Sequence, residues 1–461
     1  MNFKFQISDF NKRVSNFRSF RFIAVMLIAY CATLTVSAQN GGTQQNLIGK
    51  AGTFAITNAR IITVSGATIE NGTLIIRNGK ISSVGRSPSV PSGAEKIDGT
   101  GLSVYPGMID AGTNMGLQEI GNGVAGTVDV RETGNLNPNA KAILGINPNT
   151  SHINITRVNG ITTVLSMPRG GLVSGQSAII NLNGSTQAEL AVVRTFGLVV
   201  GFPTINTFAG FSRLTGVRRI NFSQAVKRRD KRVKELKDLF EKVKRYEKVK
   251  NASAKDKSIP HPAMDLKMEA MIPYVTGNKP IIFGAQRGRD IRGVVKFVED
   301  MKIKAIIYGG AEAWKVADGL KKNKIGVIYN RIYTTPLRAD DSYDSLYSAP
   351  SKMRKAGLTF CISTGDNGAN VRDLPYQAGI ASAYGLSPED ALKSVTLFPA
   401  QILGIANKYG SIEVGKVANI VVTNGDILEQ RTNIKHLFIN GRKLPLTSRH
   451  TELFDAFKNR K

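Results

Sequence analysis

The stretch Pro106-Gly107-Met108-Ile109-Asp110-Ala111-Gly112-Thr113-Asn114 contains the end of an apolar run that begins at Val104. Similar runs recur along the middle of the chain and alternate with segments of helical pattern, at 290–301, 312–322 and 388–396. Strands that alternate with helices are typical of a parallel α/β fold, and eight such runs indicate a (β/α)8 barrel. The predicted barrel strands are 104–109, 161–166, 177–182, 197–200, 280–283, 305–308, 326–329 and 358–362.

Strand-forming runs also lie at both ends of the chain, outside this α/β middle. They cover 60–64, 74–76 and 81–84 near the start, and 420–422 and 437–439 near the end. Asn78-Gly79 and Asn440-Gly441 lie beside these runs, and Asn-Gly is a strong signal for a tight hairpin turn. We therefore expect the two ends to form one small β-sandwich. The predicted domains are a β-sandwich from 47–103 and 407–450, a barrel from 104–406, and a basic tail at 451–461.

The first 38 residues have the features of an export signal. Basic residues precede an apolar run at 22–36, and Val36-Ser37-Ala38 is a small-residue cleavage site. Cleavage there would leave 423 residues with Cys361 as their one cysteine, so we expect no intramolecular disulfide. Export without disulfides suits a bacterial periplasm. Retention of residues 1–38 as a membrane anchor is the alternative.

The chain is strongly basic, with a formal net charge of +28. Much of this charge lies at 227–250, where twelve Lys or Arg accompany five Asp or Glu. This segment also holds, at helical spacing, the apolar residues Val233, Leu236, Phe240 and Val243. The pattern predicts a basic amphipathic helix, which either packs on the barrel as a solvated outer helix or docks an acidic partner or membrane. Residues 251–256 are polar, and we expect a loop there. We expect no specific nucleic-acid partner.

Several phrases resemble those of the amidohydrolase superfamily, in its exported imidazolonepropionase-like and dipeptidase-like branch. The opening stretch is similar to the family's first barrel strand, which usually has the form P-G-x-I-D-x-H-x-H. Two further phrases that resemble the family are Pro399-Ala400-Gln401-Ile402-Leu403-Gly404 and Gly410-Ser411-Ile412-Glu413-Val414-Gly415-Lys416. The resemblance covers nearly the whole chain after residue 38 and implies a metal-dependent hydrolase fold.

Members of this family hold a catalytic metal at the ends of barrel strands. Two histidines follow strand one, one follows strand five, one follows strand six, and an aspartate follows strand eight. The four histidine positions here hold Gly112, Asn114, Gly284 and Gly309, and the aspartate position holds Asp366. Glycine has no side-chain ligand, and a neutral amide binds zinc poorly compared with imidazole. The zinc that the resemblance implies therefore lacks its ligands, and we expect no metal cofactor.

Four residues near these positions have functional interpretations of their own. Asp366 is the candidate catalytic group, as a base acting on a water that no metal activates. Asp366, Asn114 and Gln286 also offer the oxygen ligands that calcium or magnesium prefers. Arg287 either binds a substrate carboxylate or caps the following helix. Gln286 and Arg287 thus complete a predicted pocket with the four histidine positions.

Two functions follow from this conflict between fold and site. By resemblance the chain is a hydrolase that acts on a carbon–nitrogen bond, in a non-peptide or dipeptide amide, through Asp366 in an unusual or metal-free site. By its missing ligands it is a non-catalytic pseudoenzyme. Such a protein would bind a small molecule or peptide, form a homo-oligomer, or pair with an active relative. The ligand positions favour the pseudoenzyme.

Overall fold

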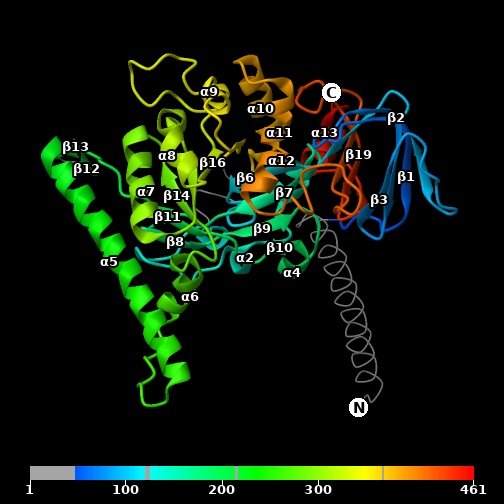
Figure 1. Cartoon of the computed structure of the whole chain (residues 1–461). Helices are drawn as coiled ribbons and strands as arrows, with labels where there is room; N and C mark the ends of the chain where they lie inside the picture. The colour runs from blue at the N-terminus through cyan, green and yellow to red at the C-terminus, as the bar shows by residue number, and fades with distance from the viewer. Residues whose placement is uncertain (1–46, 120–124, 213–215, 366–367, 461) are drawn as a thin grey trace, which may run out of the picture. The chain divides into compact units, whose positions relative to one another are not determined.

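The computed structural model describes residues 47–119, 125–212, 216–365 and 368–460. These residues fold into mixed α/β structure (Figure 1). No helix within them is both long enough and apolar enough to cross a bilayer. The predicted export signal at 1–38 and the candidate base Asp366 lie outside the described residues.

Strands from both ends of the chain share one eight-stranded sheet. β1 pairs with β2 along one side, and on its other side with β4 and then β5. The C-terminal strands join through β18, which runs antiparallel to β5. This sheet buries an apolar cluster of its own, in which the Phe54 and Phe438 ring centroids are 5.1 Å apart. The strands are β1 (Phe54–Ile61), β2 (Ile69–Arg77), β3 (Lys80–Gly85), β4 (Glu95–Asp98), β5 (Ser103–Pro106), β18 (Ile420–Thr423), β19 (Ile434–Ile439) and β20 (Arg442–Leu444).

Both Asn-Gly pairs form the turns that the sequence predicts. Asn78-Gly79 joins β2 to β3, and Asn440-Gly441 joins β19 to β20. All four residues have positive φ, between 52° and 77°, as a two-residue type I′ hairpin requires. The two turns also touch, because a Cβ on Gly441 would lie 2.5 Å from the Cα atom of Gly79. The turns thus bring opposite ends of the chain together.

The α/β middle contains two further sheets. In the first, β6 and β7 are parallel and β9 is antiparallel to β7. In the second, β11, β14, β15, β16 and β17 are parallel and β8 is antiparallel to β11. The strands are β6 (Met108–Thr113), β7 (Ile161–Ser166), β8 (Val173–Gln176), β9 (Ala178–Asn181), β10 (Ala191–Val193), β11 (Leu198–Gly201), β14 (Ile281–Ala285), β15 (Ala305–Gly309), β16 (Gly326–Tyr329) and β17 (Phe360–Ile362).

The third predicted strand differs from an all-parallel barrel. The predicted run 177–182 corresponds to β9, which β8 directly precedes, and both strands run antiparallel to their neighbours in the two sheets. The connection from β7 to β8 is too short for a parallel crossover, which takes a dozen or more residues. Gly170 and Gly171 in this connection have φ of 89° and 71°, and they allow the chain to reverse.

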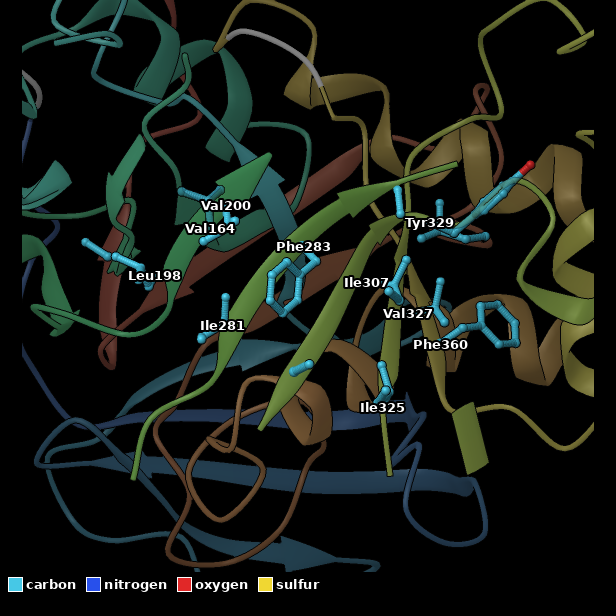
Figure 2. Packing of buried hydrophobic residues seen from close by; sticks show 14 of the residues in the cluster. Val164, Leu198, Val200, Ile281, Phe283, Ile307, Ile325, Val327, Tyr329 and Phe360 are labelled. Carbon is cyan, nitrogen blue, oxygen red and sulfur yellow. The ribbon is translucent and has the colours of Figure 1, made fainter. Parts of the chain in front are cut away.

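The two faces of the parallel strands bury different apolar clusters. Phe283 of β14 and Ile307 of β15 face the cluster that the helices share (Figure 2). The intervening residues face a second, inner cluster to which both middle sheets contribute. Its members include Ile109, Leu165, Ile179, Ile282, Ile306, Ile328 and Cys361. Burial on both faces explains why these strands are continuous apolar runs in the sequence.

Helices flank the middle sheets (Figure 1). They are α2 (Ala142–Gly145), α3 (Ser151–Arg157), α4 (Gln187–Leu190), α5 (Phe222–Lys255), α6 (Leu266–Val275), α7 (Gly288–Met301), α8 (Ala317–Lys322), α9 (Ala349–Lys355), α10 (Leu374–Ala383), α11 (Pro388–Ser394), α12 (Leu397–Ile402) and α13 (Arg449–Phe457). A two-stranded hairpin, β12 (Phe208–Ser212) and β13 (Gly216–Arg219), precedes α5.

α5 contains the predicted basic amphipathic helix and extends beyond it at both ends. Its residues Leu236, Phe240 and Val243 are buried, and the Phe240 ring meets Phe297 of α7 edge-on with centroids 5.2 Å apart. The inner face of the helix therefore packs on the middle of the fold. Figure 1 shows it as a long rod that passes beside α7.

The loop predicted at 251–256 is wrong, because α5 continues to Lys255. The polar side chains that suggested a loop are satisfied within the helix. Asn251 donates to Glu247, and the Ser253 hydroxyl donates to the carbonyl of Lys250 at 2.9 Å. Local hydrogen bonds of this kind let polar residues remain helical.

Candidate functional site

Three predicted pocket residues lie together at the carboxyl ends of neighbouring parallel strands. Gly284 of β14 is the register partner of Tyr308, and Ala285 is the partner of Gly309 in β15. Gln286 directly follows β14, and a Cβ on Gly309 would lie 2.2 Å from Gln286 Nε2. The Gln286 side chain therefore covers Gly309.

Gly112, in β6, lies beside the same strand ends. A Cβ there would lie 2.6 Å from Tyr308 Cε2, 3.1 Å from Ser363 Oγ and 3.3 Å from Met167 Cε. The Tyr308 hydroxyl in turn lies 3.4 Å from the carbonyl oxygen of Gly365. The ends of β6, β7, β15 and β17 thus meet around one ring, that of Tyr308.

Asn114 lies just after β6 and is buried. Its Nδ2 donates to Gln118 Oε1 at 3.1 Å, while its Oδ1 has no hydrogen-bond partner among the described residues. His152 of α3 contacts the backbone of the same Gln118, and burial lowers the pKa of its imidazole against the opposing charge of Glu119. No local sequence pattern relates His152 to Gln118, since 34 positions separate them.

Three buried amide oxygens at these strand ends have no hydrogen-bond partner in the described part of the chain. They are Asn114 Oδ1, Gln286 Oε1 and Asn330 Oδ1. Asn330 follows β16 and packs on Gly365, where a Cβ would lie 2.4 Å from Asn330 Nδ2. An unsatisfied buried acceptor costs roughly 1–3 kcal/mol, so the three oxygens favour a bound group that donates hydrogen bonds.

Asp110, in the same stretch as Gly112, forms a buried hydrogen-bond network. Oδ1 accepts from Ser363 Oγ at 2.5 Å and from Gly112 N at 3.1 Å. Oδ2 accepts from Thr364 Oγ1 at 2.5 Å and from Thr364 N at 3.2 Å. Burial raises the pKa of Asp110, and these hydrogen bonds oppose the shift. With every lone-pair direction used, Asp110 has a structural role in holding β6 to the end of β17.

Arg287 does not cap the helix that follows it. It occupies the N-cap position of α7, but its side chain makes no capping hydrogen bond. The first helical N–H, that of Gly288, instead donates to Glu312 Oε2 at 2.8 Å. Arg338 and Lys315 also donate to Glu312, at 2.7 and 2.9 Å. Burial alone would raise the pKa of Glu312, but these hydrogen bonds outweigh it and bring the pKa to about 2.

The residues at these strand ends do not fit the zinc site of the family. Within the described residues, no group of three His, Cys, Asp or Glu side chains is placed to hold a metal ion. A side chain at Gly112 or Gly309 would collide with Tyr308 or Gln286, and Gly309 has a φ of 115° that residues with side chains rarely adopt. Only Gly284 has room, with its nearest neighbour, the Val200 carbonyl oxygen, at 4.0 Å.

A cavity of about 510 Å³ lies elsewhere, between α6 and the start of β14. Its walls include Gln176, Tyr274 and Lys279, and none of the predicted pocket residues. Lys279 Nζ already donates to both oxygen atoms of Thr195 at 2.7 Å. The cavity is therefore separate from the strand ends that carry the predicted site.

Comparisons with known proteins agree with this fold. The amidohydrolase family model matches residues 325–444. An imidazolonepropionase from Thermoanaerobacter pseudethanolicus is 23% identical over 399 residues, 80% of this chain and 88% of that protein. An amidohydrolase structure from Thermotoga maritima has a TM-score of 0.74 and 27% identity, over 85% of this chain and 99% of its own.

A putative prolidase from Bifidobacterium longum shares the fold at lower similarity. Its TM-score is 0.50 at 18% identity, over 89% of this chain and 98% of its own. These matches extend over both the terminal sheet and the α/β middle, as the motifs of the sequence predict. The family model and these relatives support the assignment of the chain to the amidohydrolase superfamily.

Proposed function

We propose that this chain is a binding or partner protein that keeps the amidohydrolase fold without zinc-dependent hydrolysis of carbon–nitrogen bonds. The observation that carries the proposal is the filled space at two ligand positions, where Tyr308 covers Gly112 and Gln286 covers Gly309. A histidine at either position would need its neighbour to move. The loss of the zinc site therefore involves the surrounding side chains as well as the four ligand positions.

We propose a closed (β/α)8 barrel in which β8 and β9 run opposite to the parallel strands. Two observations support closure: both middle sheets contribute to one inner apolar cluster, and Asp110 of β6 is bonded to Ser363 and Thr364 after β17. For the terminal sheet we propose a small β-sandwich, because β1 pairs with β4 and β5 at different points and the sheet folds around its own cluster. A crystal structure with β6 and β17 far apart would contradict the barrel.

The ligand that suits this site is a small molecule or peptide rich in N–H donors. Asn114, Gln286 and Asn330 offer buried oxygens that such donors would satisfy. A thermal-shift screen of amino acids and dipeptides tests this, and we expect a stabilising ligand whose effect is lost in Gln286→Leu. The matched control is Gln401→Leu, at an exposed position of α12. Equal loss in both variants, or no stabilising ligand, would contradict the proposed pocket.

The partner form of the proposal is a homo-oligomer or a complex with an active relative. Light scattering on the purified protein measures the first.

For location we propose the bacterial periplasm, with a mature chain that begins near Gln39. Mass spectrometry of the native protein checks this, since a mass that still includes residues 1–38 would favour the retained anchor.

The decisive experiment measures zinc and hydrolysis together. Elemental analysis of the protein beginning at Gln39 should give well under one equivalent of zinc, and amide hydrolysis should not respond to added zinc or to a chelator. Gly112→His with Asn114→His should still bind zinc weakly, because Tyr308 fills the space and Gly284 and Gly309 stay without ligands.

The opposite result would show that the chain is a zinc-dependent hydrolase. That result is stoichiometric zinc with chelator-sensitive hydrolysis that disappears in Asp366→Asn. Hydrolysis that resists the chelator but disappears in Asp366→Asn would instead establish the metal-free enzyme.

A further inference from the structure

A surface built from the β12–β13 hairpin and the start of α5 is not used by the proposed site. We call it the hairpin surface, and its residues are Phe208, Val217, Arg218, Arg219, Phe222, Lys227, Arg228, Lys231 and Arg232. In Figure 1 the hairpin projects beside the N-terminal end of α5, at the outer edge of the fold. All nine of these residues are exposed to solvent.

The hairpin surface exposes large apolar side chains. Phe208, Val217 and Phe222 are 49%, 55% and 61% exposed. Phe208 is the register partner of Arg219, and Val217 lies two residues before Arg219, so Phe208, Val217 and Arg219 point to one face of the hairpin. Exposed apolar groups gathered in this way mark an interaction surface more often than isolated ones do.

Cations without acidic partners surround these apolar groups. Arg218, Arg219, Lys227, Arg228, Lys231 and Arg232 are exposed, and none of them forms an ion pair with another described residue. The basic residues that do have partners lie nearby: Arg229 binds Asp230, and Lys237 binds Asp300 of α7. The positive charge of the hairpin surface is therefore left uncompensated.

The buried residues further along α5 fix this surface on the fold. Leu236, Phe240 and Val243 are fully buried, so the helix cannot rotate to cover its own cations. Its N-cap residue Asn221 forms a capping box with Gln224, at 2.8 and 3.3 Å, and this fixes the junction with β13. The hairpin surface is thus presented outward.

We propose that the hairpin surface docks the protein on a membrane that contains anionic phospholipids. Its arginines and lysines would bind lipid phosphates, while Phe208, Val217 and Phe222 enter the boundary between headgroups and acyl chains. Cations alone would suit a nucleic acid equally well. The exposed valine and the two phenylalanines favour the membrane, since an aliphatic side chain gains nothing from a solvated phosphate backbone.

Vesicle co-sedimentation tests the proposal, with the protein that begins at Gln39. Residues Asn46–Lys461 form one compact unit, and omitting 1–38 removes an apolar segment that would itself bind lipid. We expect binding to phosphatidylcholine vesicles that contain phosphatidylglycerol to be about tenfold tighter than to phosphatidylcholine alone. Equal binding to the two, or binding to neither, would overturn the proposal.

Matched pairs of substitutions locate the contact. Arg218→Gln with Arg219→Gln should weaken binding to the anionic vesicles by about tenfold, whereas Arg77→Gln with Arg86→Gln, an equal charge loss on the terminal sheet, should change it by less than about twofold. All four arginines are exposed, so we expect each variant to fold with an unchanged unfolding temperature. Equal effects of the two pairs would mean that net charge alone binds the vesicles, and would overturn the proposal.

Substitution of the exposed phenylalanines distinguishes binding to a membrane from binding to a nucleic acid. Phe208→Ser with Phe222→Ser should weaken vesicle binding severalfold, and Phe454→Ser with Phe457→Ser on α13, at 66% and 51% exposure, should not. No effect of the first pair, or tighter binding to a short DNA duplex than to the anionic vesicles, would contradict membrane docking and identify the surface as a polyanion site.

Discussion

Ser363 Oγ and Asp110 Oδ1 are 2.5 Å apart, although 253 positions separate the two residues in the sequence. The bond joins β6 to the residue after β17, which are the first and last strands of the α/β middle. Thr364 binds the other carboxylate oxygen of Asp110 through both its hydroxyl and its backbone N–H. A single buried carboxylate thus connects two edge strands that no described backbone ladder joins.

We expect Asp110→Ala to lower the free energy of unfolding by about 3 kcal/mol or more, because it leaves three buried donors without an acceptor, while Ser363 Oγ can still donate to the Gly112 carbonyl. Ser363→Ala removes one donor and should cost about 1 kcal/mol. Urea unfolding followed by circular dichroism measures both. Equal, small losses would show that the network contributes little to holding β6 and β17 together.

Gly309→Ala and Gly284→Ala form a matched pair at neighbouring strand ends. The first introduces a Cβ beside Gln286 and imposes the 115° φ of Gly309 on alanine, so it should cost roughly 2–4 kcal/mol. The second meets only a carbonyl oxygen at 4.0 Å and should change stability by less than about 1 kcal/mol. Urea unfolding of the two variants distinguishes a filled ligand position from an open one, and similar losses in both would contradict the filled-space argument.

The sequence predicts the elements of this fold better than it predicts their directions. The runs at 161–166 and 326–329 coincide with β7 and β16, because apolar residues buried on both faces leave a continuous signal. β8 was missed, since Ser174, Gly175 and Gln176 lack that signal. The reversal of β8 and β9 depends on glycines with positive φ, and a sequence shows the glycines but not their conformation.

The candidate site, like the fold, could be predicted from the sequence only in part. The motif identifies the ligand positions, and the structure places Gly112, Gly284 and Gly309 at strand ends of the middle sheets. The space beside these positions is filled by residues from distant segments. Tyr308 packs against Gly112, and Asn330 packs against Gly365. No local sequence pattern encodes such contacts. Asp110 was visible in the motif, but its partners lie more than 250 positions away.

Arg157 of α3 is a buried cation without an acidic partner in the described chain. Its side chain is 1% exposed, Nη1 reaches only the Leu182 carbonyl at 3.4 Å, and Nε has no partner. Burial lowers the pKa of this guanidinium to about 10. We expect Arg157→Met to raise the free energy of unfolding by about 1–2 kcal/mol, because it removes a buried charge and keeps the volume. Arg157→Lys keeps the charge and should give no gain in the same urea titration; a loss in Arg157→Met would show that the guanidinium is needed.

Glu312 gives the chain a pH-dependent contribution to stability. Its side chain is almost buried, and hydrogen bonds from Arg338, Gly288 and Lys315 outweigh burial and lower its pKa from 4.5 to about 2. A carboxyl whose pKa is lower in the folded protein than in the unfolded chain stabilises the fold above its unfolded value, and this stabilisation is lost as the pH falls toward the folded value. The relevant window is therefore pH 4.5 down to about 2.

Arg338→Met removes the closest charged partner of Glu312, at 2.7 Å, and should reduce this stabilisation. We expect the variant to be less stable than the parent by about 2 kcal/mol at neutral pH, with the difference shrinking as the pH falls through the window, because a protonated Glu312 no longer needs the guanidinium. Guanidinium chloride titrations at neutral pH and near pH 3 measure the change. Arg60→Met is the control, since it breaks a pair with Glu70 in which both side chains are more than half exposed, and such pairs contribute little. A difference for Arg338→Met that is the same at both pH values would show that the side chain acts through packing and not through the charge of Glu312.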